Sequence, residues 1–514
     1  PAEIQEVASS NNGLKQALKR LEVGSPDTPR SWFYEDKDPQ WILGTITAKL
    51  EAMVDLKSIS DYDLSKSDKF GPQGGTAPLK ERLDSFNEYF EHLYSPEIIK
   101  DPVWKRAKEL AIQRLHFNEA GVPAASKAVV ARGLGEDKYN TSSGYPLYLK
   151  RKNPKAIEEA LSVGSRCIDL KYPCTLGSRA TMGKTGKNAR TIFMASMAVN
   201  INGQRYQQPL QDYIRSKQIP FFTPWEGWDH VQTNISKFWK DSLKFGADYT
   251  KMDQHFNKYH GLEVYDVIKH YFKREYWTEL KTIIEYVFTV PIITNLGYID
   301  QEHAMPSGSE WTNFLETVWN YIFCIYLELK YHLRFKCIMG IGDDQLWFLE
   351  GKWDPKGITW IIDVVMKEFE RAGLPGNKDK QEVSLEKTGF LQRFMCSEWN
   401  GQNGDLTAAG VYSLIRNVTS QVYPERYHNE KEWDSSMFAL RVVMIAENCC
   451  NHPLFPWYIK EFVAKANPNI LEWVRQSDAA LSETQRKAKS IANFLPTYNQ
   501  EKQDMSILQF KTVK

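Results

Sequence analysis

The spacing of hydrophobic residues changes along the chain and predicts helical margins around a mixed centre. Residues 1–75 are polar and interrupted by prolines and glycines, which indicates an extended arm with short helices. Hydrophobic residues recur at helical spacing over 85–117, whereas 132–200 show no sustained periodicity and are predicted to be mainly loops. After about residue 400 most segments have helical spacing, up to a polar tail that begins near residue 496.

Three β-like runs lie in the centre of the chain, at residues 243–249, 335–341 and 345–349. Only the three residues 342–344 separate the last two runs, which is a hairpin signal. Helical spacing is expected over 261–277 and 310–331. The order of these elements predicts an α+β fold with an antiparallel central sheet.

Length and composition are those of an ordinary globular protein. The chain has 514 residues, 42% of them hydrophobic and 25% charged, which excludes wholesale disorder and suggests about three domains or subdomains. No apolar run reaches the roughly 18 residues that a membrane span requires. The charges nearly cancel, with 65 Lys and Arg against 64 Asp and Glu, so only their distribution along the chain can point to a partner.

Cysteine usage bears on the redox compartment and on metal binding, and aromatic content bears on the core and on surfaces for stacking. The seven cysteines are scattered and form no CxxC pair, which is typical of a reducing compartment. Cys449, Cys450 and His452 are close in sequence, but adjacent cysteines rarely both ligate one metal, so a zinc site is disfavoured. Aromatic residues reach 13%, which fits large cores or surfaces on which bases stack.

Two groups of carboxylates stand at the ends of the β-like runs. Asp248 lies at the end of the first run and Asp253 shortly after it, and Asp343 and Asp344 lie between the other two runs. If these strands were neighbours, Asp248 and Asp343 would repel each other unless divalent cations intervened. Mg²⁺ binds one or two carboxylates together with phosphate oxygens, which suits phosphoryl chemistry. Taken alone, a Gly-Asp-Asp triplet is more often a plain hairpin turn, and the other two aspartates are compatible with a solvated strand end and a helix cap.

A basic segment precedes these carboxylates. No acidic residue occurs over residues 171–200, and this segment contains Arg179, Lys184, Lys187 and Arg190 among glycines. Such a concentration of cations suits the binding of phosphate groups. The alternative is a solvated, flexible loop.

Four further motifs lie before, between and after these segments along the chain. Residues 141–146 read Thr-Ser-Ser-Gly-Tyr-Pro, residues 307–313 Ser-Gly-Ser-Glu-Trp-Thr-Asn, residues 377–380 Asn-Lys-Asp-Lys and residues 389–393 Gly-Phe-Leu-Gln-Arg. Together with the carboxylates and the basic segment, they resemble the motif set of viral RNA-dependent RNA polymerases. The form of the motifs is most similar to the polymerases of small double-stranded RNA viruses, picobirnavirus-like first and partitivirus-like second.

The resemblance implies a right-hand polymerase fold of fingers, palm and thumb, with an antiparallel palm sheet and a helical thumb. The implied parts are an N-terminal arm over 1–75 that bridges fingers and thumb, fingers over 76–240 with part of 262–304, a palm over 241–400, and a thumb with the C-terminal tail over 401–514. The tail after residue 496 is expected to be mobile and to fold back toward the active site.

The resemblance also implies a role for each motif residue. The catalytic group would be Asp248, Asp343, Asp344 and Lys380, with the three aspartates as ligands of Mg²⁺ or, alternatively, Mn²⁺. The nucleotide-binding residues would be Arg179, Lys184, Lys187, Arg190, Asp253, Ser307, Thr312 and Asn313. The residues that contact template or primer would be Ser143, Gly144 and Arg393.

The residues that read the sugar and the general acid need further comment. Asp253 is placed to accept a hydrogen bond from a ribose 2′-hydroxyl, the group that distinguishes RNA precursors from DNA precursors. Many similar sequences have an asparagine where this chain has Glu316, so the last residue that reads the sugar is open. Lys380 would act as a general acid, but Lys378 is two positions away, and only the Asn-x-x-Lys spacing favours Lys380.

The implied reaction is two-metal nucleotidyl transfer, in which a 3′-hydroxyl attacks the α-phosphorus of a ribonucleoside triphosphate and pyrophosphate leaves. It would be directed by an RNA template and serve viral genome replication and transcription. The implied partners are an RNA template and product duplex, ribonucleoside triphosphates and a viral capsid protein, with no membrane. The protein is expected to act as a monomer in the virion interior or the host cytoplasm.

Three other classes of protein are weighed against this interpretation. Residues 177–185 approach the phosphate loop of a P-loop NTPase but have one residue too many between the glycines. A reverse transcriptase shares the palm carboxylates, but it usually has an aromatic residue where Ile341 stands. A catalytically dead RNA-packaging protein would not need Asp248, Asp343 and Asp344 intact.

Overall fold

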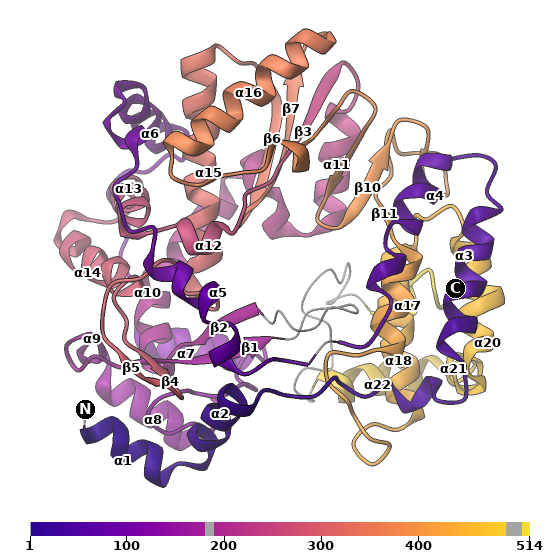
Figure 1. Cartoon of the computed structure of the whole chain (residues 1–514), viewed down its shortest axis with the longest axis horizontal. Helices are drawn as coiled ribbons and strands as arrows, with labels where there is room; N and C mark the ends of the chain where they lie inside the picture. Colours follow the sequence, from indigo (N-terminus) through magenta and orange to yellow (C-terminus); the bar gives the residue numbers. More distant parts are fainter. Residues whose placement is uncertain (1, 74, 180–189, 490–505) are drawn as a thin grey trace.

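The computed structural model describes residues 2–73, 75–179, 190–489 and 506–514. Viewed down its shortest axis, the chain forms three groups of elements that follow one another around a ring (Figure 1). The N-terminal segments, drawn in indigo, lie against two of these groups. The predicted α+β fold with an antiparallel central sheet is confirmed.

The palm sheet has the strand order β6-β7-β3-β8. Its strands are β3 (Ser242–Ala247), β6 (Phe335–Ile341), β7 (Asp344–Glu350) and β8 (Glu382–Ser384). All neighbours are antiparallel, and Ala247 at the end of β3 pairs with Gln345 near the start of β7. This register places the residue after β3 beside the β6–β7 turn.

Helices cover both faces of the palm sheet. Strand β7 sends alternate side chains to opposite faces, and both sets are buried under helices. Trp347 and Leu349 belong to the core formed with α15 (Glu310–Tyr331) and α16 (Pro355–Arg371). Leu346 and Phe348 pack on the other face with α11 (Trp228–Phe238). The predicted helix over 310–331 is confirmed, and the Ser309 hydroxyl caps it by accepting the Trp311 N–H at 3.2 Å.

The fingers region contains a second sheet, in the order β2-β1-β4-β5. Its strands are β1 (Cys174–Arg179), β2 (Arg190–Met194), β4 (Ile292–Thr294) and β5 (Gly297–Ile299). Helices α7 (Ser126–Gly135), α8 (Pro154–Val163) and α10 (Met197–Ser216) surround it (Figure 1). The prediction that 132–200 is mainly loop is therefore wrong, because these strands and helices are too short to show a clear period.

A small sheet links the end of the predicted palm to the helices of the predicted thumb. The sheet has the order β11-β10-β9, formed by β9 (Lys387–Phe390), β10 (Arg393–Cys396) and β11 (Val411–Tyr412). The main helices are α17 (Leu414–Val422), α18 (Ser435–Ala446), α21 (Pro468–Val474) and α22 (Asp478–Lys489). The helical spacing predicted after residue 400 is confirmed by these elements.

The N-terminal arm contacts both fingers and thumb. Its helices are α1 (Ala2–Ser10), α2 (Asn12–Val23), α3 (Pro39–Glu51) and α4 (Lys57–Leu64). The Asn11 amide donates to the Leu147 carbonyl at 2.8 Å, and Leu21 packs with β1 residues. Ile42, Ile46 and Leu50 of α3 share one hydrophobic core with α17 and α18. The arm thus joins two regions that are distant in sequence, whereas the exact domain limits stay a prediction.

Two predicted helices differ from the structure. The segment 261–277 contains the end of α13 (Lys258–Ile268) and the start of α14 (Trp277–Val287), which are separated by tight turns. Between them Phe272 adopts an extended conformation and is 0% exposed, so burial of its ring overrides the helical spacing. The segment 85–117 is helical as predicted, but in separate pieces: the end of α5 (Leu83–Asn87), two 3-10 turns at Glu88–Phe90 and Glu97–Lys100, and α6 (Pro102–Arg114), with Pro96 and Pro102 interrupting the chain between them.

The described end of the C-terminal tail packs against the thumb. Ile507 and Phe510 are 0% exposed in the thumb core. The buried carboxylate of Glu447 accepts the backbone N–H of Lys511 at 3.1 Å and of Thr512 at 3.0 Å. Two apolar side chains thus anchor residues 506–514, whereas residues 497–505 of the tail lie outside the described residues, so its return toward the active site stays a prediction. Within the described ranges, no helix has the length and apolar character needed to cross a membrane.

Candidate active site

The register of the palm sheet brings two of the predicted aspartates to one end of neighbouring strands. Asp248 follows β3 directly, and Asp343 lies in the turn between β6 and β7. Both side chains are exposed, whereas Asp344, the first residue of β7, is half-buried. The charge of Asp248 acts on both other carboxyl groups. The predicted proximity of these three residues is thereby borne out in the geometry, while their roles stay a prediction.

Helix α15 holds the turn that carries Asp343. The Gly342 N–H donates to the Thr317 hydroxyl at 2.8 Å, and the Gly342 carbonyl accepts the Asn320 amide at 2.8 Å. Gly342 has a φ of +57°, a left-handed conformation that favours glycine. A long and largely buried helix therefore positions the turn through both backbone groups of Gly342.

The carboxyl groups of the turn resist ionisation. Burial raises the pKa of Asp344 to about 7, and the negative charges of Asp343 and Asp248 act in the same direction. The pKa of Asp343 is also raised, first by desolvation from the segments around the turn and then by the charge of Asp253, although Arg190 opposes this shift. Like charges of this kind are stabilised by a nearby cation.

The chemistry of the donor set fits a divalent cation. Asp248, Asp343 and Asp344 offer hard oxygen ligands. Desolvation raises the pKa of all three carboxyl groups, and neighbouring carboxylates raise the pKa values of Asp343 and Asp344 further. The side chains are not drawn together into a coordination shell: in the described part of the chain no three His, Cys, Asp or Glu residues are grouped to hold a metal ion. The fit therefore rests on charge and ligand type.

Asp253 and Ser307 meet beside these carboxylates. Asp253 lies on the short helix α12 (Met252–His255), and its Oδ2 accepts a hydrogen bond from the Ser307 hydroxyl. Thr312 instead donates to the Pro306 carbonyl at 2.9 Å, within its own loop. Asn313 accepts the indole N–H of Trp225 at 3.2 Å. The structure thus brings together Asp253 and Ser307, whereas Thr312 and Asn313 make other bonds.

Two of the four candidate basic residues, Arg179 and Arg190, are described by the structure. Of these two, Arg190 faces the carboxylates. The charge of Arg190, at the start of β2, lowers the pKa of Asp343. Arg179, which pairs with Arg190 in the β1–β2 ladder, forms an ion pair with Glu425 of the thumb region through Nε–Oε1 at 2.9 Å and Nη2–Oε2 at 3.2 Å. Lys184 and Lys187 lie outside the described residues.

The geometry separates the two lysines that the sequence left as alternatives. Lys378 Nζ lies 2.8 Å from a carboxylate oxygen of Asp363 on α16. The charge of Lys380, by contrast, lowers the pKa of Asp248, while burial raises it. Gln381, which the motif reasoning missed, accepts the Asp248 N–H at 2.9 Å and donates to the Asp248 carbonyl at 2.7 Å, so it fixes this segment against the end of β3.

The residues expected to contact template or primer have structural bonds. Ser143 is 4% exposed, and its hydroxyl accepts the Leu149 N–H at 3.1 Å. Gly144 has a φ of +64° and packs closely against the Ala195 carbonyl. Arg393 is 4% exposed, with its guanidinium 4.3 Å from the centre of the Trp228 ring. Arg393 therefore packs within the small sheet β11-β10-β9, and the roles of these three residues toward template or primer stay a prediction.

Two disfavoured interpretations have no support in the geometry. Gly177 lies within the antiparallel strand β1, whereas a phosphate loop needs a turn that leads into a helix. The His452 Nε2 is bonded to Asp63 at 2.8 Å, and its Nδ1 accepts the Leu454 N–H at 3.0 Å, so both ring nitrogens are used within the thumb and arm.

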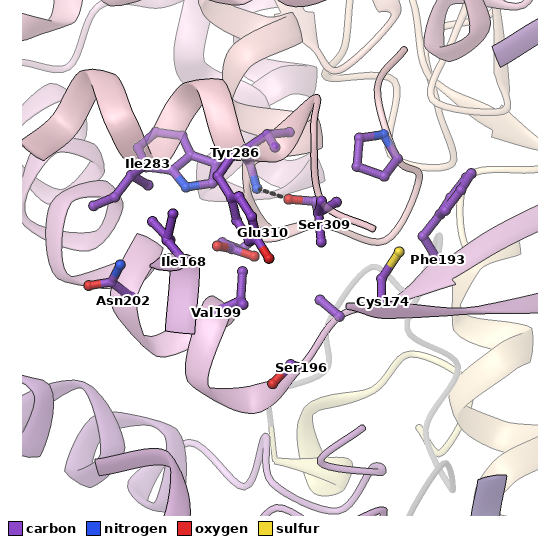
Figure 2. Close-up of a pocket in the computed structure, with 15 residues that line it drawn as sticks. Ile168, Cys174, Phe193, Ser196, Val199, Asn202, Ile283, Tyr286, Ser309 and Glu310 are labelled. Carbon is purple, nitrogen blue, oxygen red and sulfur yellow. Dashed lines mark hydrogen bonds between the residues drawn. The ribbon is translucent and has the colours of Figure 1, made fainter. Parts of the chain in front are cut away.

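A cavity lies beneath the loop that carries Ser307. Figure 2 shows Val199, Ile283, Tyr286 and Glu310 around the same space, which is lined mainly by apolar side chains. The Glu310 carboxyl accepts a hydrogen bond from the Asn200 amide. Burial raises the pKa of Glu310 to about 8, against an ordinary value of 4.5. Glu310 is thus a largely neutral acid at the start of α15.

The Glu310→Gln variant is expected to be more stable than wild type, and the difference in unfolding free energy should grow as the pH rises from about 5 to about 8. The unfolded chain releases the Glu310 proton near 4.5, whereas the folded chain holds it to about 8, so the wild type loses stability across this window. The glutamine variant lacks this loss, and its advantage should exceed about 1 kcal/mol at pH 8. Thermal unfolding from pH 5 to 9 measures it. The matched control is Glu109→Gln at an exposed position. A difference independent of pH would contradict the assignment.

Comparison with known proteins agrees with this geometry. No family model matches the chain. It is 25% identical over 467 residues to a potential RNA-dependent RNA polymerase of human picobirnavirus (strain Human/Thailand/Hy005102/-), covering 86% of this chain and 83% of that protein. It is also 25% identical over 242 residues to an RNA-directed RNA polymerase of Cryptosporidium parvum virus 1 (strain KSU-1), covering 43% of this chain and 42% of that protein.

Solved structures extend the comparison to the whole fold. The crystal structure of the RNA-dependent RNA polymerase of a human picobirnavirus has a TM-score of 0.81 at 21% identity, covering 98% of this chain and 96% of that one. An insertion-loop deletion mutant of such a polymerase has a TM-score of 0.77 at 22% identity, covering 93% and 94%. The fold is that of a viral RNA-dependent RNA polymerase. Within that class, the chain is a homologue of the picobirnavirus polymerase, as the motifs predicted.

Proposed function

We propose that this protein copies RNA from an RNA template by transferring nucleotides from ribonucleoside triphosphates to a 3′-hydroxyl, in viral genome replication and transcription. The observation that carries the proposal is the placement of Asp248 beside the Asp343–Asp344 turn, at the end of neighbouring antiparallel strands. The relationship to the picobirnavirus polymerase supports the same reaction.

The three aspartates would hold the divalent cation, Mg²⁺ or alternatively Mn²⁺. Such a cation supplies activation of the attacking hydroxyl and neutralisation of charge on the phosphates. Arg190 faces this charge from β2 and is placed to contact the triphosphate. Asp253, oriented by the Ser307 hydroxyl, would accept the ribose 2′-hydroxyl.

Lys380 is the candidate for proton donation to the departing pyrophosphate. Its charge acts on Asp248, and the segment that carries it is tied to Asp248 by Gln381. A lysine held near the reacting phosphates can donate a proton as negative charge develops on the leaving group. Lys378 is instead engaged with Asp363, away from this position.

Replacing Lys380 by leucine is expected to slow nucleotide addition by about 10²-fold or more while leaving nucleotide affinity nearly unchanged, because general acids typically contribute this much. Single-turnover incorporation measures the rate, and its dependence on nucleotide concentration gives the affinity. Lys378→Leu is the matched control and should stay within about twofold of wild type, because its partner is Asp363. Equal rates for Lys380→Leu and wild type would refute the role.

The remaining predictions are coarser. RNA template and product, ribonucleoside triphosphates and a viral capsid protein are proposed partners, and the virion interior or host cytoplasm is the proposed site of action. The protein is proposed to act as a monomer. Arg179 is proposed to bind nucleotide only when it leaves Glu425, because its guanidinium makes a two-point ion pair there.

The proposed function is tested by offering the purified protein, with Mg²⁺ and an RNA template, either ribonucleoside or deoxyribonucleoside triphosphates. We expect polymer only from the ribonucleotides and only with template present. Preferential use of deoxyribonucleotides would identify a reverse transcriptase. The absence of any polymer under both conditions, with Mg²⁺ and with Mn²⁺, would favour a catalytically dead RNA-binding protein.

A further inference from the structure

A strained two-residue turn joins β9 to β10. Phe390 and Arg393 are paired in the antiparallel ladder, so only Leu391 and Gln392 form the turn between the strands. Both residues have positive φ, +51° for Leu391 and +63° for Gln392. The central residues of such turns are usually asparagine and glycine, because longer side chains crowd the backbone in the left-handed region. Residues of this kind persist only where the surrounding structure holds them, and they cluster at functional sites.

Three side chains hold the backbone groups of this turn. The Leu391 N–H donates to the Asp344 carboxylate at 3.2 Å. The Leu391 carbonyl accepts a hydrogen bond from the Arg393 guanidinium at 3.1 Å. The Gln392 carbonyl accepts the Tyr62 hydroxyl at 3.0 Å. The turn therefore connects Tyr62 of the N-terminal arm with Asp344, a candidate cation ligand.

Packing of α4 on the small sheet fixes the position of Tyr62. The Tyr62 ring stacks on Phe394 of β10, with ring centres 5.0 Å apart and planes 16° apart. Ile59, one turn earlier on α4, is 0% exposed and packs with Cys396 and Val411 of the same sheet. Figure 1 shows α4 close to β10 and β11. Because residues three positions apart share one face of a helix, the buried face of α4 also carries Tyr62 to the turn.

We propose that Tyr62 is a positioning residue for nucleotide transfer: it holds the turn Leu391–Gln392 in its left-handed conformation, and the turn fixes the Asp344 carboxylate. The arm would thereby act on the catalytic edge of the palm through a residue 330 positions away along the chain. The inference rests on the proposed function, since Asp344 matters here as one of the groups that would hold the cation.

The loss of Tyr62 has a direct structural consequence. The Gln392 carbonyl would lose its donor and the Phe394 ring its stacking partner, so nothing from the arm would oppose relaxation of the strained turn. When the turn relaxes, the Leu391 N–H moves away from Asp344 and the carboxylate is free to rotate. Because Asp344 would act at the reacting phosphates, the rate of transfer should fall while nucleotide affinity changes little.

The first test measures kcat and KM for addition of one ribonucleotide to a primed RNA template. Tyr62→Ala should lower kcat by about tenfold and leave KM within about twofold of wild type. Tyr62→Phe keeps the ring and loses only the hydroxyl, so kcat should fall by about threefold or less, in keeping with one hydrogen bond. The matched control is Tyr427→Ala, an exposed tyrosine of the thumb region, which should stay within about twofold of wild type.

A second substitution distinguishes action through the turn from simple support of the arm. Gln392→Gly keeps the carbonyl that accepts the Tyr62 hydroxyl and relieves the backbone strain, because glycine adopts positive φ without a steric penalty. In the Tyr62→Ala protein, Gln392→Gly should restore kcat to within about threefold of wild type. A glycine in this turn would not repair an arm that has merely detached from the sheet.

Hydrogen exchange provides a readout that does not depend on activity. Peptides that cover residues 387–396 are compared by mass spectrometry in the metal-free proteins. Tyr62→Ala should speed exchange in this segment by about tenfold, because the turn opens more often. Adding Gln392→Gly should bring the exchange rate back to within about threefold of wild type.

The outcomes separate this inference from the proposed function. If wild type copies RNA and Tyr62→Ala has the wild-type kcat, the inference is overturned and the proposed function stands. If Tyr62→Ala is slow but Gln392→Gly restores neither kcat nor exchange, Tyr62 supports only the arm, and the inference is again overturned. If wild type forms no RNA, the proposed function fails, and the role of Tyr62 in nucleotide transfer fails with it, whatever the exchange rates.

Discussion

Replacing Asp343 by alanine is expected to reduce RNA synthesis by at least about 10³-fold, because it removes a cation ligand at the reacting phosphates. The position depends on the palm register: Asp343 lies in the β6–β7 turn beside the end of β3, and Asp248 acts on it electrostatically. The same loss is expected for Asp248→Ala. Elongation from a labelled primer measures both variants against wild type.

An inactive variant is informative only if it is folded. The matched control for Asp343→Ala is Asp379→Ala, since Asp379 is an exposed acid in the turn that carries Lys378 and Lys380. This control should retain activity within about threefold of wild type, because substitutions at exposed positions have small effects. Thermal unfolding should show Asp343→Ala to be folded and at least as stable as wild type, since a repelled carboxyl group is removed. Measurable elongation by the Asp343 variant would refute the cation assignment.

Replacing Asp63 by alanine is expected to destabilise the junction of arm and thumb by about 3–5 kcal/mol, because each buried donor left without an acceptor costs about 1–3 kcal/mol. Asp63 lies on α4 and is 0% exposed. Its carboxylate accepts the Ser413 hydroxyl at 2.6 Å and the Leu414 N–H at 2.8 Å, at the start of α17. It also bonds His452 Nε2 at 2.8 Å, so alanine would leave several buried donors without an acceptor.

Chemical denaturation followed by tryptophan fluorescence measures this loss. The matched control is Asp61→Ala, on the same helix but exposed, which should change the unfolding free energy by no more than about 0.5 kcal/mol. Asp63→Asn should be intermediate, because it keeps one acceptor oxygen for the start of α17. Equal unfolding midpoints for the Asp63→Ala and Asp61→Ala variants would show that the arm does not stabilise the thumb through this group.

The palm could be predicted from the sequence because its signals are local. Short hydrophobic runs define β3, β6 and β7, and the two residues between the last two strands admit only a tight turn. Once these strands pair as antiparallel neighbours, Asp248 and Asp343 must lie at the same edge. The long helix α15 was equally predictable, because Ser309 caps it and hydrophobic residues continue along its length.

The rest of the site depends on contacts between segments that are far apart in the chain. Arg179 resembled a nucleotide-binding residue, but its partner Glu425 lies 246 positions away, so its ion pair could not be inferred from a motif. Arg393 matched a motif position, yet its guanidinium packs on Trp228. Glu316, which is buried beside Gly342, gave one signal that could have been used: an acid on the inward face of an otherwise apolar helix, at helical spacing from Asn313 and Asn320.

The central claim is that the Asp248–Asp343 edge of the palm sheet catalyses RNA-templated RNA synthesis. The most direct measurement is the sequence of the product formed on a heteropolymeric RNA template of known sequence, with four ribonucleoside triphosphates and Mg²⁺. The account predicts RNA complementary to the template from wild type and no product from Asp343→Ala. Product unrelated to the template, or the same complementary product from both proteins, would contradict it.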